Sequence, residues 1–177
     1  MGLYKKDQCQ RYERKNCTKE IINVFKNDKK ILLCGNGGSA ADAQHLAAEL
    51  SGRFYIDRPP LFAEALHVNT SYLTAVANDY SFDEVYARLV KAKGRPSDIL
   101  IGISTSGNSS NIIKAIYAAK EVGMISVGFT GKTGGKMVSL CDYLINIPSQ
   151  DAARIQEAHI LIGHIICEIV ERKLFSA

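Results

Sequence analysis

Residues 30–39 read KILLCGNGGS, and this stretch decides the fold class. A short apolar run that ends in a glycine-rich turn is typical of a buried strand. Ser39 is a favourable helix N-cap, and residues 40–50 behind it are rich in helix-forming side chains. The stretch therefore predicts a strand, a glycine turn and a helix in direct succession.

The same succession recurs later in the chain. Residues 98–103 (DILIGI) run into STSGNSS at 104–110, and 111–122 carry a helical pattern with Gly123 as its C-cap. Further strands are predicted at 61–68, 124–129 and 143–147, and further helices at 18–27, 70–77, 83–93 and 151–173. Strands that alternate with helices predict an α/β fold, a single three-layer domain with a central five-stranded parallel sheet. Within it we distinguish an N-terminal helical segment, 1–29, from the domain proper, 30–177.

Composition and charge exclude several classes of protein. The 177 residues are 46% hydrophobic and 23% charged, enough to bury a core, and no apolar run is long enough to span a membrane. The net charge is +4, but nine Lys and Arg against four Asp and Glu fall in the first 30 residues. The rest is close to neutral, so we expect no nucleic-acid partner. Five widely spaced cysteines without a CxxC pair indicate reduced thiols and a cytoplasmic location.

Two motifs resemble nucleotide sites without completing them. Residues 35–40 match G-x-G-x-x-A after a strand, but the next strand does not end in the acidic residue that holds a ribose. Residues 131–133 resemble the end of a P-loop, but Ser126 stands where its first glycine is required. These incomplete motifs therefore argue against a nucleotide as the ligand.

The loop after the third predicted strand is a candidate anion site. Backbone N–H groups freed by glycine, hydroxyl groups and the N-terminus of the next helix all attract phosphate. The candidates are Ser104, Thr105, Ser106 and Ser109. The alternative is that these residues only form turns and caps, but two such loops in one sheet favour an anion.

Metal ligands are indicated on two predicted helices. His45 and Glu49 are four residues apart, so they lie on one helix face and can hold one ion. Gln156 and His164 are eight apart and share a broad face of the last helix. An exposed i,i+4 polar pair remains the alternative for His45 and Glu49. His67 and His159 lack a comparable pairing and are interpreted as ordinary surface or satisfied histidines.

Taken together, these motifs resemble the sugar isomerase (SIS) domain family, specifically its phosphoheptose isomerases. The resemblance rests on residues 34–39 leading to His45 and Glu49, on 78–79, on 102–109, and on 154–157 through His164. It implies a flavodoxin-like, nucleotide-binding-type topology. It also implies a zinc-binding cytoplasmic homotetramer, with active sites between subunits, that converts sedoheptulose 7-phosphate into D-glycero-D-manno-heptose 7-phosphate for bacterial surface polysaccharides.

The resemblance also implies residue roles. Glu49 would be the base and His164 the acid, and one zinc ion per subunit would be held by His45, Glu49, Gln156 and His164. The substrate would contact Asn36, Gly37, Gly38, Glu49, Asn78, Asp79, Ser104, Thr105, Ser106, Ser109 and Gln156. A rival interpretation is a non-catalytic binding or regulatory protein of the DnaA initiator-associating type, which carries Asn at the position of His164.

Overall fold

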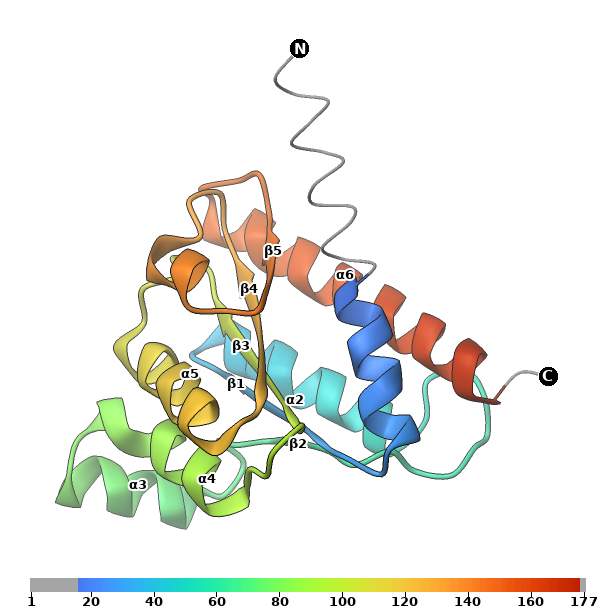
Figure 1. Cartoon of the computed structure of the whole chain (residues 1–177). Helices are drawn as coiled ribbons and strands as arrows, with labels where there is room; N and C mark the ends of the chain where they lie inside the picture. The colour runs from blue at the N-terminus through green and yellow to red at the C-terminus, as the bar shows by residue number, and fades with distance from the viewer. Residues whose placement is uncertain (1–15, 176–177) are drawn as a thin grey trace.

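The computed structural model of the chain describes residues 16–175 and contains one central sheet (Figure 1). In the described residues the sheet has five strands, in the order β2-β1-β3-β4-β5, and every neighbouring pair is parallel. The predicted parallel sheet is therefore confirmed, and its order is that of flavodoxin-like folds. The strands are β1 (Ile31–Gly35), β2 (Ala63–Ala65), β3 (Ile99–Ser104), β4 (Ile125–Thr130) and β5 (Tyr143–Asn146).

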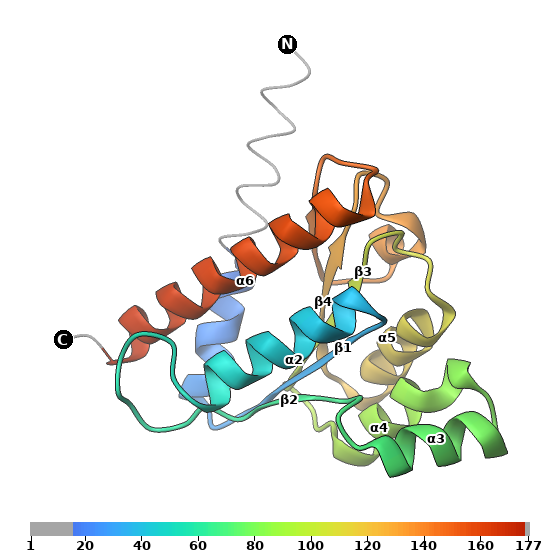
Figure 2. The same ribbon diagram turned by 180° about the vertical axis from the view of Figure 1, so that it is seen from behind.

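Helices cover both faces of the sheet and form the outer two layers (Figures 1 and 2). On one face lie α2 (Gly38–Ser51), α6 (Ala152–Phe175) and the helical residues 16–26. On the other lie α3 (Thr70–Asp79), α4 (Val85–Lys93) and α5 (Ser110–Val122). Two 3-10 helices, η1 (Phe82–Glu84) and η2 (Gly135–Ser139), complete the described elements.

The strands divide their side chains between two cores. Ile31 and Leu33 of β1 pack on the face of α2 and α6, whereas Leu32 and Cys34 pack on the face of α4 and α5. This alternation follows from the two-residue period of a strand, and a strand buried on both faces is apolar throughout. The helical residues 16–26 contribute to the first core through Cys17, Ile21 and Val24.

The structure corrects two of the predicted elements near the sheet. The strand expected at 61–68 is reduced to β2, three residues at the sheet edge that pair only with β1. Pro59 and Pro60 before it lack N–H donors, and the N–H of Leu61 binds the carbonyl of Leu50 instead. The helix expected at 83–93 is also shorter, because its first residues belong to η1 and α4 begins at Val85.

The start of α2 is a further correction. Ser39 does not cap the helix: it is a buried residue of α2 itself, which begins at Gly38. The N-cap is Gly37, whose φ of 55° lies in the left-handed region that glycine adopts without strain. The chain therefore turns into the helix earlier than predicted. Gly123, by contrast, is confirmed as the C-cap of α5, with a φ of 81°.

The last helix, α6, carries apolar residues around much of its circumference. Ile155, Ile166 and Val170 are buried in the first core. Leu161, Ile165 and Ile169, four residues apart, form a stripe that is 60%, 46% and 38% exposed. Despite these residues, no helix in the part of the chain that the structure describes has the length and apolar character of a membrane span.

Candidate active site and metal centre

Three of the predicted metal ligands converge where α2 meets α6. His45 Nε2 lies 3.1 Å from Glu49 Oε1 and 3.1 Å from His164 Nε2. One ligand atom from each of the three side chains lies within 4.8 Å of the others. The pairing of His45 with Glu49 follows from their spacing in α2, but the approach of His164 is a tertiary contact.

This cluster suits a divalent cation by the chemistry of its donors. Two imidazole nitrogens and one carboxylate oxygen form a donor set that zinc takes in catalytic sites. His45 and Glu49 remain partly exposed, so an ion can reach the cluster from solvent. The residues present therefore fit a metal ion.

A close contact between the two helices brings the cluster together. Gly163 of α6 is buried, and a Cβ built there would overlap the side chain of Leu46 on α2. Leu46 follows His45 and Gly163 precedes His164 directly. Because glycine has no side chain at this point, the helices approach each other beside the cluster.

Gln156, the fourth predicted ligand, lies against the glycine loop. A Cβ built on Gly38 would be 2.5 Å from Gln156 Nε2, so the amide fills the space above that glycine. Gln156 stands on α6 two turns before His164, on the side of the N-terminus of α2. Its side chain fills the space between α6 and the glycine loop, and its coordination of a metal stays a prediction.

The glycine loop is also tied to the second loop of the sheet. The side-chain amides of Asn36 and Asn111 exchange two hydrogen bonds of 2.9 Å each. Asn111 belongs to the first turn of α5 and is buried. Sequence reasoning selected Asn36 and missed Asn111, although an Asn directly after a serine-rich loop is a signal that was available.

The hydroxyl groups predicted to bind an anion gather at the start of α5. Ser104 Oγ lies 3.0 Å from Ser109 Oγ and 3.5 Å from Ser106 Oγ. The thirteen residues of α5 begin at Ser110, so the hydroxyls meet the positive end of the helix dipole. Thr105 occupies the same loop, and its carbonyl accepts the N–H of Gly131. The structure thus brings the three serines together.

Asn78 and Asp79 lie at the end of α3, on the opposite face of the sheet from α6. Both are exposed, and Asn78 Nδ2 donates to Asp79 Oδ1 at 2.9 Å. The structure does not bring this pair to the histidine cluster within one chain.

Two histidines, His67 and His159, lie outside the cluster. His159 is fully buried, and its Nε2 lies 3.2 Å from the carbonyl oxygen of Thr130, to which it donates. Its Nδ1 is buried without a hydrogen-bond partner. Burial lowers the pKa of His159 and also that of His67. The interpretation of His159 as a satisfied histidine is therefore correct for one ring nitrogen only.

Comparison with known proteins identifies the family of this chain. The sequence profile of the SIS domain matches residues 12–131. The chain belongs to the SIS domain family, a class defined here by the parallel sheet and by the two polar loops at its carboxyl edge.

Within that family the chain groups with the phosphoheptose isomerases. It is 59% identical to the phosphoheptose isomerase of Aneurinibacillus thermoaerophilus over 88% of this chain and 79% of that protein. It is 56% identical to phosphoheptose isomerase 2 of Campylobacter jejuni over 92% and 81%. The solved phosphoheptose isomerase of Neisseria gonorrhoeae is 47% identical, with a TM-score of 0.85 over 90% of this chain and 85% of that one. The DnaA-type alternative finds no support in these relatives.

Proposed function

We propose that the chain isomerises sedoheptulose 7-phosphate to D-glycero-D-manno-heptose 7-phosphate. The relatives named phosphoheptose isomerase support this reaction. The observation that carries it is the meeting of the Glu49 carboxylate and the His164 imidazole at one cluster with His45. An aldose–ketose isomerisation needs one group for a proton on carbon and another for protons on oxygen, and this cluster supplies both kinds.

The reaction moves the carbonyl from C2 to C1 through an ene-diol. Glu49 takes a proton from C1 while the C2 carbonyl oxygen receives a proton from His164. His164 then accepts the proton of the C1 hydroxyl, and Glu49 returns its proton to C2. Each group gives up in one half of the reaction the proton that it takes in the other, so both are restored at the end of a turnover.

The same residues would hold a zinc ion, with His45, Glu49 and His164 as ligands and Gln156 as the fourth. Because Glu49 cannot be a tightly bound ligand and a free base at once, it would change its contact with the ion during turnover. When bound, the ion would act as a Lewis acid on the substrate's oxygen atoms. The two imidazole donors of the cluster support zinc rather than a hard, oxygen-seeking cation such as Mg²⁺.

The two loops divide the substrate between them in this proposal. Ser104, Thr105, Ser106 and Ser109 would bind the phosphate, supported by the serine cluster at the N-terminus of α5. Asn36, Gly37, Gly38 and Gln156 would line the sugar chain, supported by the amide of Gln156 against Gly38.

We further propose a homotetramer in which Asn78 and Asp79 serve the site of a neighbouring subunit. The exposed apolar stripe of Leu161, Ile165 and Ile169 supports burial against another copy. Sedimentation as a monomer at micromolar concentration would contradict both the assembly and the shared site.

We also propose a cellular location and a domain organisation for the chain. We infer a cytoplasmic protein, supported by the free state of Cys17, Cys34, Cys141 and Cys167 among the described residues. We also keep the division into an N-terminal helical segment, 1–29, and a SIS domain, 30–177. Residues 1–15 of that segment lie outside the described residues.

A coupled assay with sedoheptulose 7-phosphate tests the function. The zinc-loaded protein should turn the substrate over, and Glu49→Gln, which keeps the shape and loses the base, should not. Elemental analysis of the purified protein should find about one zinc per chain. Absence of turnover by the zinc-loaded wild type would overturn the enzymatic function.

A further inference from the structure

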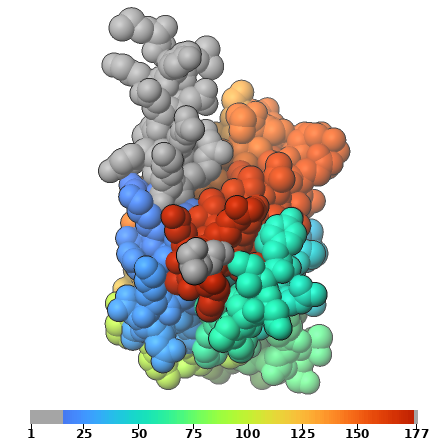
Figure 3. All heavy atoms as spheres, turned by 90° about the vertical axis from the view of Figure 1, so that its right-hand side faces the viewer, coloured from blue at the N-terminus to red at the C-terminus, as the bar shows by residue number. Residues whose placement is uncertain are grey.

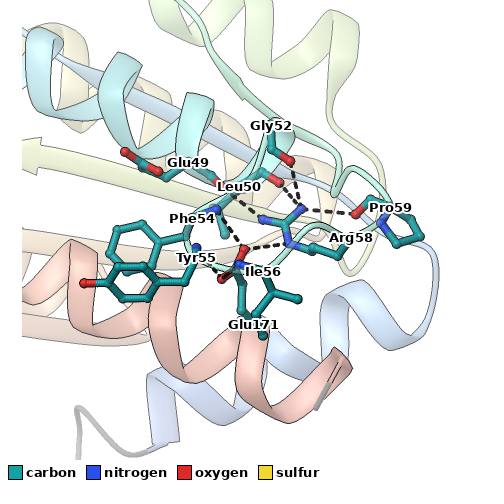
Figure 4. A network of polar contacts seen from close by, with 9 residues as sticks. All are labelled: Glu49, Leu50, Gly52, Phe54, Tyr55, Ile56, Arg58, Pro59 and Glu171. Carbon is teal, nitrogen blue, oxygen red and sulfur yellow. Dashed lines mark hydrogen bonds and ion pairs between the residues drawn. The ribbon is translucent and has the colours of Figure 1, made fainter. Parts of the chain in front are cut away.

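A buried carboxylate holds the segment that follows α2. Residues 52–59 pass beside the C-terminal half of α6 (Figures 2 and 3). There Glu171 is 1% exposed, and its carboxylate accepts the backbone N–H groups of Phe54, Tyr55 and Ile56 at 2.8, 2.8 and 3.1 Å (Figure 4). Burial by itself would raise the pKa of Glu171, but these donors and Arg58 outweigh it and lower the pKa. Glu171 is therefore a buried anion.

Arg58 joins this anion to the end of α2. Its Nε donates to Glu171 Oε1 at 3.0 Å. Its two terminal nitrogens point the other way and donate to carbonyl oxygens at the end of α2 and beyond: those of Glu49 (3.0 Å), Leu50 (2.9 Å), Gly52 (3.3 Å) and Pro59 (3.1 Å) (Figure 4). The last carbonyls of a helix lack intrahelical partners and form its negative end, so a cation is favoured there.

The network touches both sides of the catalytic cluster. Arg58 binds the backbone carbonyl of Glu49 itself. Glu171 lies seven residues after His164, two turns along the same face of α6. Phe54, whose N–H is held by Glu171, places its ring 5.5 Å from the ring of His164, centroid to centroid. A shift in the network would therefore move Glu49 and His164 relative to each other.

We propose that Arg58 and Glu171 are positioning residues of the isomerase: their ion pair holds the last turn of α2 against α6 and so sets how Glu49 and His164 face one another. This proposal rests on the proposed function. Neither residue belongs to the histidine cluster, and both act through the groups they hold. A pair with a purely structural role would change stability alone.

A second buried carboxylate provides the matched control. Asp98 is 1% exposed, accepts the backbone N–H groups of Lys30 and Arg95, and pairs with the Lys30 ammonium group at 2.6 Å. It precedes β3, at the edge of the sheet opposite the two polar loops. Asp98→Asn thus removes a comparable buried charge far from the site.

The experiment compares Glu171→Gln, Asp98→Asn and the wild type. We measure Tm, kcat and KM, and the affinity for Zn²⁺ alone by competition with a chelator. Both variants should lower Tm. Only Glu171→Gln should lower kcat and Zn²⁺ affinity, each by about tenfold or more, with little change in KM. Loss of a group that orients a metal ligand has an effect of this size. Wild-type kcat and Zn²⁺ affinity in folded Glu171→Gln would overturn the proposal.

Two milder variants decide the matter if Glu171→Gln does not fold. Phe54→Leu keeps the backbone N–H and removes the ring beside His164, so kcat and Zn²⁺ affinity should fall with little change in Tm. Arg58→Lys keeps the cation but loses the planar fork of donors, and should lie between the wild type and Glu171→Gln. Wild-type values in both would refute the positioning role. A wild type that binds Zn²⁺ without turnover would instead overturn the function, and the Zn²⁺ affinities would still test the positioning.

Discussion

The Nε2 atoms of His45 and His164 lie 3.1 Å apart, although 119 positions separate the two residues in the sequence. An imidazole nitrogen either donates a proton or accepts one, so a single proton can bridge these two ring nitrogens. Glu49 Oε1 lies at the same distance from His45 Nε2. A cation in place of that proton would engage all three groups, and α2 and α6 would hold it together.

Replacing His164 should separate chemistry from folding. His164→Asn keeps a polar side chain on a partly exposed helix face, but Asn neither titrates near neutral pH nor replaces an imidazole ligand. General acid–base catalysis is worth about 10²- to 10⁴-fold and metal loss adds to it, so kcat should fall by at least about a thousandfold. Zinc content should also fall, with the oligomer unchanged.

The coupled assay and elemental analysis check this, with His67→Asn as a control outside the cluster. A tenth of the parent activity in His164→Asn would contradict the assignment.

The serine cluster predicts a defect in substrate binding. Ser104→Ala with Ser106→Ala removes two hydroxyls of the cluster at the start of α5. Each hydrogen bond to a charged group is worth about 1.5–3 kcal/mol, so KM should rise at least about tenfold. Tm should change little. Ser139→Ala, on the exposed end of η2, serves as the control. An unchanged KM in the double variant would show that the phosphate binds elsewhere.

The contact between α2 and α6 predicts that Gly163→Ala weakens the metal centre. The added Cβ would overlap Leu46, which is buried and cannot give way freely. Overpacking of this kind costs about 1–3 kcal/mol of the free energy of unfolding. Because the helices must separate beside His164, Zn²⁺ affinity should fall as well. Denaturant unfolding and chelator competition measure the two effects. Gly163→Ala with unchanged Zn²⁺ affinity would argue against a spacing role for this contact.

Burial of His159 predicts loss of stability in mild acid. Its pKa is lowered in the folded state, so below the unfolded value of about 6.5 the unfolded chain binds more protons. The free energy of unfolding should therefore not be reduced by His159 above that pH. It should decrease as the pH falls below it, by at most about 1.4 kcal/mol per pH unit for one histidine. His67 contributes with the same sign.

Urea unfolding between pH 7.5 and 5 tests this. His159→Gln, whose amide can still donate to the Thr130 carbonyl, should show a smaller decrease than the wild type. Equal slopes for the two proteins would show that His159 does not contribute.

Much of the fold follows from local sequence. Short apolar runs such as 30–34 and 98–103 form strands because both of their faces are buried, and the glycine turns and helix formers behind them dictate parallel pairing. The pairing of His45 with Glu49 is equally local, since the helical period places residues four apart on one face. The serine cluster follows from a single loop between β3 and α5.

Other features depend on contacts between distant segments, and no periodic pattern in the sequence indicates such contacts. The N-cap at Gly37 depends on the backbone dihedrals of the turn. Residue type alone favours Ser39 as the N-cap, and that prediction is wrong. The Asn36–Asn111 pair and the Arg58–Glu171 network each join segments separated by more than 70 residues. The sequence by itself determined the three layers and the parallel sheet, and the residue types of the candidate site. Only tertiary packing decided that Gly163 lets α6 approach α2, because that spacing depends on side-chain volumes from both helices at once.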